Sequence, residues 1–103
     1  MTDEQLAQIV ARLDQRLGLS TLWLFGSEAR GTATARSDLD LAALFVRPLD
    51  PLALLEARDD LALLLGRDID LVDLGRASPA LAMQVLRHGR LVLDRHPSLR
   101  VRF

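Results

Sequence analysis

The chain has 103 residues, half of which are hydrophobic, and a formal net charge of −1, which predicts one small domain over residues 1–103. The pI of about 6.1 indicates no overall basic field of the kind that attracts nucleic acid directly. Cysteine and lysine are absent, which excludes disulfides, thiolate zinc sites, lysyl adducts and Walker-type phosphate loops. No apolar run approaches the roughly 20 residues of a membrane span, and the polar start does not resemble a signal peptide, so we expect a cytoplasmic protein.

The first half of the chain predicts a helix followed by two strands. Thr2 and Gln5 have the spacing of a capping box, and apolar residues then recur at helical period as far as Gly18, which ends the helix. The next predicted elements are a buried strand at residues 20–25, a turn or short helix at 27–31, a polar loop at 32–37 and a second strand at 38–46. This second strand is apolar on both faces beyond its first residues, so we expect it in the centre of the sheet.

The second half alternates helices with strands. Asp50-Pro51 and Ser78-Pro79 each place a capping side chain before a proline at the first helical position. The predicted elements are a helix from 51 to about 65, a strand at 68–74, a helix ending at Gly89 and a short strand at 90–93. This alternation predicts an α/β (α+β) sheet with helices packed mainly on one face. We expect the tail from about residue 95 to be loosely held.

Two further features could serve a partner protein. The run Leu61–Leu65 contains more leucine than one inward helix face needs, so the surplus is either core or an exposed patch for another chain. The C-terminal end is basic, and it is either a solvated tail or an arm that docks on a partner or touches nucleic acid. Its arginines are Arg87, Arg90, Arg95, Arg100 and Arg102.

Two aspartates at the start of the second strand are the main candidates for chemistry. Gly26 and Ser27 follow an apolar run, and ten residues separate Ser27 from Asp38. Asp38 and Asp40 lie two apart on a strand, so their side chains project to the same side. Two such carboxylates need a proton or a cation between them, and magnesium is the hard cation that prefers oxygen ligands. The alternative is a pair of acids that caps a solvated strand end.

A third acid is needed for a two-metal site, in which ions roughly 3.5–4 Å apart hold the attacking and leaving oxygens of a phosphoryl displacement. The third predicted strand offers Asp68, Asp70 and Asp73, of which the first two share a face. We favour Asp70, because it lies inside an apolar run where an acid without a partner is costly. Asp68 stays as the alternative, since it lies at the strand start and is either a ligand or simply solvated.

Together these residues resemble a known signature. Gly26-Ser27, ten residues and Asp38-x-Asp40 look like the motif of the nucleotidyltransferase superfamily that includes DNA polymerase β and kanamycin nucleotidyltransferase. The string GSEARGTATARSDLDL, the later DIDLVDL and the short length resemble the minimal nucleotidyltransferase (MNT) domain, the antitoxin half of HEPN–MNT toxin–antitoxin pairs. The likeness extends from about Leu22 to Leu93 and implies the mixed-sheet core of that superfamily.

The resemblance implies a role for each matching residue. Gly26 and Ser27 would bind the nucleotide triphosphate through backbone N–H groups and the hydroxyl, and Arg30 would support this nucleotide-binding loop by an ion pair rather than by direct catalysis. Asp38 and Asp40 would ligate two Mg²⁺ ions. Asp70 would ligate the catalytic ion and help to deprotonate the incoming hydroxyl.

The function implied is a protein adenylyltransferase that moves AMP from ATP to a tyrosine hydroxyl of a cognate HEPN toxin and so silences the toxin. The chain contains no tyrosine, so tyrosine self-modification is impossible, and we expect the acceptor tyrosine on another chain. Two alternatives stay open: an antitoxin that neutralises its toxin by complex formation alone, and nucleotidyl transfer to a small molecule, for which one small domain forms at most half a pocket.

Overall fold

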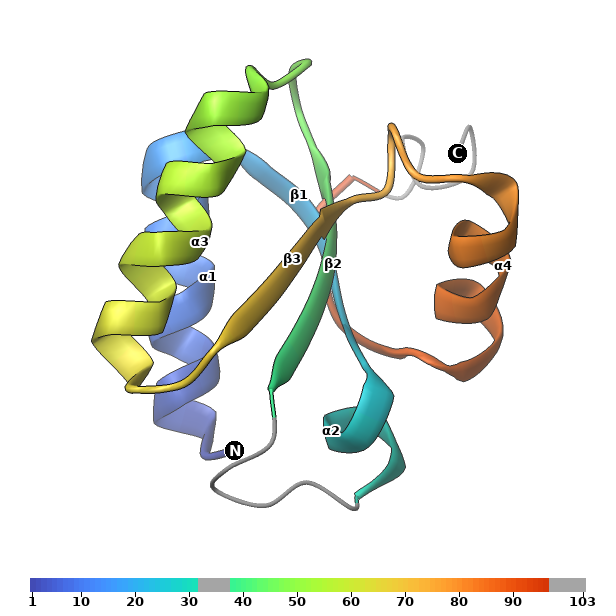
Figure 1. Ribbon diagram of the computed structural model, residues 1–103, viewed down its shortest axis with the longest axis horizontal. Helices are drawn as coiled ribbons and strands as arrows, with labels where there is room; N and C mark the ends of the chain where they lie inside the picture. The colour runs from blue at the N-terminus through green and yellow to red at the C-terminus, as the bar shows by residue number, and fades with distance from the viewer. Residues whose placement is uncertain (32–37, 97–103) are drawn as a thin grey trace.

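The computed structural model describes residues 1–31 and 38–96, and within them one sheet runs through the centre of the molecule (Figure 1). Its strands are β1 (Leu19–Phe25), β2 (Leu39–Phe45), β3 (Ile69–Asp73) and β4 (Arg90–Asp94), in the order β3-β2-β1-β4. β1 pairs antiparallel with β2 and β4, whereas β2 and β3 are parallel. The predicted mixed sheet is therefore confirmed, and β2 is a central strand as expected.

Helices cover both faces of this sheet, two of them on the same face. The described helices are α1 (Asp3–Leu17), α2 (Gly26–Arg30), α3 (Pro51–Leu65) and α4 (Pro79–His88). Figure 1 shows α1 and α3 side by side against one face and α4 against the other, with α2 at one end. The larger core cluster lies under α1 and α3, and a smaller one, which includes Trp23 and Val85, lies under α4. The prediction of helices mainly on one face is confirmed, with α4 as the helix on the other face.

The helix ends follow from the capping residues seen in the sequence. Thr2 and Gln5 form the predicted capping box, and the side chains of Asp50 and Ser78 each accept a hydrogen bond from the first turn of their helix. Gly18 ends α1 with φ +69°, and a Cβ at this position would approach Val46 Cγ2 to 2.7 Å. Glycine therefore permits the left-handed turn that leads α1 directly into β1.

Ion pairs of Asp60 with Arg12 and Arg16 join the two helices that share a face. Arg12 Nη1 lies 3.0 Å from Asp60 Oδ1 and 2.9 Å from Asp60 Oδ2. The two side chains are 44% and 23% exposed, so solvent screens much of their attraction. This pair lies between α1 and α3, which both pack on the sheet face opposite α4.

The start of the predicted tail is held to the body of the protein. The backbone N–H of Arg95 donates to the carbonyl oxygen of Ser20 at 2.9 Å, and its guanidinium lies 2.7 Å from the Asp14 carboxylate. Residues 97–103, which include Arg100 and Arg102, lie outside the described residues, as does the predicted loop at 32–37. None of the helices in the described parts of the chain is long and apolar enough to cross a membrane.

The leucine-rich end of α3 divides between core and surface. Leu61 is fully buried in the cluster under α1 and α3, whereas Leu63 is 86% exposed. Leu64 is 38% exposed. Part of the leucine surplus is therefore surface, one of the two alternatives that the sequence left open.

We predict a large loss of stability when Leu61 is truncated to alanine and almost none when Leu63 is. Leu61→Ala removes buried methyl groups and leaves a cavity, which should lower the free energy of unfolding by about 2–5 kcal/mol. Leu63→Ala removes a side chain that is already in water, so the free energy of unfolding should change by less than about 0.5 kcal/mol. Urea unfolding followed by circular dichroism measures both, and equal losses would contradict the burial of Leu61.

Candidate active site

The parallel pairing of β2 with β3 brings two of the predicted acids together. The strands pair with Leu39 opposite Ile69 and Asp40 opposite Asp70. Leu39 and Ile69 point into the core under α1 and α3, so Asp40 and Asp70 project from the other face. Asp38 precedes Asp40 by two residues and is exposed. The three predicted acids therefore belong to one end of the sheet, on the face that α4 covers further along.

The other two acids of the third strand differ from Asp70. Asp68 precedes β3, and its backbone carbonyl accepts a hydrogen bond from Leu39 N at 2.9 Å. Asp70 lies within β3 but is exposed, as Asp68 is, so the burial that the apolar run predicted for Asp70 is wrong. Asp73 ends β3, where its side chain accepts a hydrogen bond from Gly75 N and lines a surface hollow with Arg76. This hollow lies beyond the opposite end of the strand, so Asp73 has no part in the acid cluster.

The Asp40 carboxyl has a pKa that its surroundings shift. Burial raises the pKa of this carboxyl above its ordinary value, and the negative charges of Asp70 and Asp38 raise it further, while Arg30 and Arg67 act in the opposite direction. The charge of Asp68 is not among these influences. The local field therefore groups Asp40 with Asp70 and Asp38, which supports Asp70 over Asp68 as the third acid.

Gly26 lies directly against the Asp40 carboxylate. The antiparallel register pairs Phe25 with Asp40, so the junction between β1 and α2 lies beside the acids. Gly26 has φ +65°, and a Cβ built on it would overlap Asp40 Oδ2. Only glycine allows both this backbone conformation and this close approach. The Gly-Ser pair and the Asp-x-Asp pair of the sequence motif are thus in contact through Gly26 and Asp40.

The first turn of α2 has backbone donors that no side chain caps. Phe25 is the residue before the helix, and it makes no side-chain capping bond. Free N–H groups at a helix start attract anions. Ser27, which is partly exposed, adds a hydroxyl at the same place. The turn can therefore donate hydrogen bonds to an anionic group that lies beside the acids.

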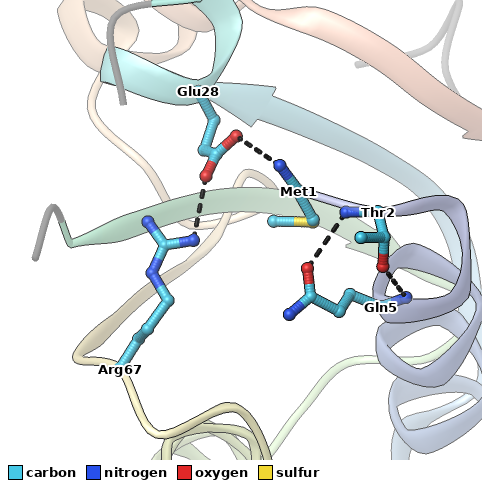
Figure 2. Close-up of polar contacts among 5 residues, drawn as sticks. All are labelled: Met1, Thr2, Gln5, Glu28 and Arg67. Carbon is cyan, nitrogen blue, oxygen red and sulfur yellow. Dashed lines mark hydrogen bonds and ion pairs between the residues drawn. The ribbon is translucent and has the colours of Figure 1, made fainter. Parts of the chain in front are cut away.

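Glu28 and Arg67 form an ion pair next to this turn, which the sequence did not predict. Arg67 Nη1 lies 2.9 Å from Glu28 Oε1, and the amino nitrogen of Met1 lies 3.7 Å from Glu28 Oε2 (Figure 2). The ion pair joins residues 39 positions apart, and no periodic pattern or short motif connects positions at that separation. Its one sequence signal is that each partner adjoins a motif residue, Ser27 and Asp68 respectively.

Arg30 lies near the acids without an ion pair among the described residues. It is exposed in the last turn of α2, and its charge lowers the pKa of Asp40. No ion pair of Arg30 occurs within the described residues. The ion pair that ties α2 to the rest of the chain is instead that of Glu28 with Arg67.

The acids fit a hard divalent cation by chemistry, without forming a ready-made cage. Within residues 1–31 and 38–96, no three acidic or histidine side chains are grouped so that they could hold a metal ion. Carboxylate oxygens are nevertheless the ligands that magnesium prefers. The raised pKa of Asp40 also records repulsion by Asp70 and Asp38, which a bound cation would relieve. The residues present therefore fit magnesium if their side chains converge on it.

The raised pKa of Asp40 predicts how metal-free stability depends on pH. Protonated Asp40 stabilises the fold at pH values below its ordinary pKa, and this contribution is lost as the pH rises through the raised pKa. In EDTA at pH 7.5, Asp40→Asn should therefore melt a few degrees higher than the unmodified chain, and the gap should shrink towards pH 4. Thermal unfolding by circular dichroism measures this.

Asp14 provides a control of opposite sign. Its hydrogen bond with Arg95 lowers the pKa of its carboxyl, so its contribution is present above the ordinary pKa and is lost as the pH falls. Asp14→Asn should therefore lower the melting temperature at pH 7.5. A lower melting temperature for Asp40→Asn as well would mean that the Asp40 carboxylate is structural.

Comparison with known proteins agrees with this geometry. Residues 7–98 match the family described as Polymerase beta, Nucleotidyltransferase. The chain is 43% identical over 72 residues to the protein adenylyltransferase MntA of Shewanella oneidensis, a match that covers 70% of this chain and 52% of that protein. It therefore spans about half the length of this curated relative.

Solved structures share the fold over nearly the whole chain. A toxin–antitoxin structure with AMP-PNP superposes with a TM-score of 0.84 at 31% identity, covering 98% of this chain and 80% of the matched one. A structure of tri-AMPylated Shewanella oneidensis HEPN toxin in complex with MNT antitoxin gives a TM-score of 0.81 at 30% identity, covering 98% and 79%. With its Gly-Ser turn against the paired acids of β2 and β3, the chain belongs to the polymerase β nucleotidyltransferase family.

Proposed function

We propose that this chain is a magnesium-dependent protein adenylyltransferase that moves AMP from ATP to a tyrosine hydroxyl of a cognate HEPN toxin, and that it thereby acts as an antitoxin. The observation that carries the proposal is the contact of Gly26 with Asp40, which itself pairs with Asp70. In this proposal, the donors that would bind phosphate lie beside the acids that would bind metal. The names of the relatives, a protein adenylyltransferase and an MNT antitoxin bound to an AMPylated toxin, support the same substrate and partner.

The described residues have separate tasks in this proposal. Asp38, Asp40 and Asp70 hold two Mg²⁺ ions, which supply charge neutralisation of the triphosphate and a lower pKa for the attacking hydroxyl. Gly26 leaves room for the Asp40 carboxylate, while Ser27 and the free N–H groups of α2 bind the triphosphate. Arg30, on the exposed side of α2, adds positive charge near the phosphates.

The transfer itself is an in-line displacement. The acceptor oxygen forms a bond to the α-phosphorus while the bond to the pyrophosphate oxygen breaks, and Asp70 accepts the proton of the hydroxyl. A tyrosine fits this role, because its pKa near 10 makes it easier to deprotonate than an alkyl alcohol. The chain has no tyrosine of its own, so the acceptor comes from the partner. The proposed reaction uses ATP and magnesium, and we propose that it takes place in the cytoplasm.

One observation favours a second candidate, an antitoxin that acts by complex formation alone. The surface exposes large apolar side chains, among them Leu63, Leu52 and Met83, which a partner chain could cover. In this alternative the site binds nucleotide at most, and neutralisation needs no transfer.

We predict that the chain adds whole AMP units to its toxin. Incubation of toxin, this chain, ATP and magnesium should raise the intact mass of the toxin by multiples of AMP, with no change in the mass of this chain. Asp70→Asn should stop the transfer and retain much of the nucleotide binding, because Asp38 and Asp40 still hold the metal of the triphosphate. Intact-mass spectrometry of both chains measures the result.

The outcomes separate the two candidates. Loss of toxicity with an unmodified toxin mass would contradict the transfer and favour complex formation. A tag that maps to serine or threonine would contradict only the tyrosine acceptor. Full neutralisation by Asp38→Asn, with a stable complex, would also favour the second candidate.

A matched pair of glycine variants tests the contact that carries the proposal. Gly26 and Gly31 both have positive φ, +65° and +71°, so alanine at either should cost about 1–2 kcal/mol of stability through left-handed strain. Only at Gly26 does the added Cβ overlap Asp40, since a Cβ on Gly31 meets no described atom within 4 Å. Gly26→Ala should therefore lose the rise in melting temperature that ATP with magnesium produces. Gly31→Ala should keep it, and equal behaviour would contradict the role of the contact.

A further inference from the structure

The helix that begins with the Gly-Ser turn has few anchors of its own. α2 has five residues, none of which is buried, and no side chain caps its start. Short helices are marginal without tertiary contacts. Proper placement of Ser27 therefore depends on what ties α2 to the rest of the fold.

Glu28 supplies such a tie through a shielded contact with Arg67. Their side chains are only 9% and 14% exposed, and the atoms Arg67 Nη1 and Glu28 Oε1 lie 2.9 Å apart. Figure 2 shows the Arg67 side chain reaching from the connection between α3 and β3 towards Glu28 of α2. A shielded charge pair of this kind fixes geometry more strictly than an exposed one.

The backbone around Arg67 is in turn fixed to both acid-bearing strands. Asp68 O accepts a hydrogen bond from Leu39 N at 2.9 Å, next to Asp40. Asp70 follows Arg67 by three residues. The positive charge of Arg67 also acts on the Asp40 carboxyl, whose pKa it lowers. Arg67 thus lies where the strand ends that carry Asp40 and Asp70 meet α2.

We infer that the Glu28–Arg67 ion pair is a positioning pair for nucleotide transfer, because it holds the Gly26–Ser27 turn in a fixed geometry relative to the strand end that carries Asp70. The inference rests on the proposed function, since it assigns the phosphates of ATP to the turn and the acceptor hydroxyl to Asp70. Neither residue touches the reacting atoms. Their part is to keep two halves of the site aligned, and misalignment by about 1 Å can cost roughly a hundredfold in rate.

The Arg12–Asp60 pair is a matched control for a purely structural role. It also joins separate elements by a short arginine–carboxylate contact, but it connects α1 with α3 on the sheet face opposite the acids. Asp60→Asn should therefore lower the melting temperature without changing nucleotide affinity. Any effect that Glu28 variants share with Asp60→Asn is structural, and only the excess belongs to positioning.

The test measures affinity for ATP with magnesium by titration calorimetry, and the rate of AMP transfer to the toxin at saturating ATP. Glu28→Ala should weaken affinity and slow transfer by about tenfold each. Glu28→Gln retains an acceptor for Arg67 without the charge and should have a smaller effect. Asp60→Asn should stay within about twofold of the unmodified chain. In the double variant with Arg67→Gln, Glu28→Ala should add little further loss, because the pair is already broken.

The outcomes distinguish this inference from the proposed function. If Glu28→Ala changes only the melting temperature, as Asp60→Asn does, the pair is structural and the inference is wrong. If Glu28→Ala does not fold, the affinity of Glu28→Gln decides in the same way. If the unmodified chain binds ATP with magnesium but transfers no AMP, the proposed function fails, while unequal affinities of the Glu28 and Asp60 variants still support the positioning role. Absence of nucleotide binding by the unmodified chain overturns both.

Discussion

The pairing of Asp40 with Asp70 across two parallel strands is the constraint on which the rest of the site depends. Side chains alternate along a strand, so a register slip of one residue in β3 would turn Asp70 into the core and Ile69 out of it. The core prevents this, since Leu39, Leu41, Ile69 and Leu71 all pack under α1 and α3. The hydrophobic face of the sheet thus fixes the position of the acids on the opposite face.

This arrangement has an electrostatic cost in the metal-free protein. Asp40 is partly buried and lies near the charges of Asp70 and Asp38, so its ionised form is disfavoured. Arg30 and Arg67 offset only part of this, because the net effect on the pKa is still upward. A chain under no demand but stability could place neutral residues here. This electrostatic cost supports the proposed cation site.

Most of the fold could be predicted because its elements carry local signals. The capping residues Thr2, Asp50 and Ser78 begin helices where expected, and alternating helices and strands predicted the layers. The candidate acids could also be predicted, since Asp38 and Asp40 share a strand face by their spacing alone. Asp70 proved to lie on the same face once the strands were paired. Strand order and register could not be predicted from the sequence in this way, because they depend on contacts between distant segments.

The Glu28–Arg67 pair shows the same limit at the level of single side chains. Arginine beside Asp68 and glutamate after Ser27 are ordinary surface residues by composition, and only the fold brings them together and shields them. Gly26 could be predicted only in part. Its place in the motif was evident, but the reason for glycine there, the approach of the Asp40 carboxylate, required the paired strands.

The ion pairs Arg12–Asp60 and Glu28–Arg67 also differ in what their geometry can explain. Arg12–Asp60 is solvent-exposed to a large extent, and such pairs contribute roughly 0–1 kcal/mol to stability. Glu28–Arg67 is mostly shielded, and a shielded pair loses much of its Coulomb attraction to the cost of removing both charges from water. Stability is therefore a weak reason for a shielded ion pair at this place. The orientation of α2 is a stronger reason for this ion pair, since the pair restricts how α2 lies against the strands that carry the acids. The shielded Glu28–Arg67 pair at the edge of the acid cluster thus fits a role in positioning the proposed site. The exposed Arg12–Asp60 pair on the opposite face of the sheet fits a role in holding two helices together.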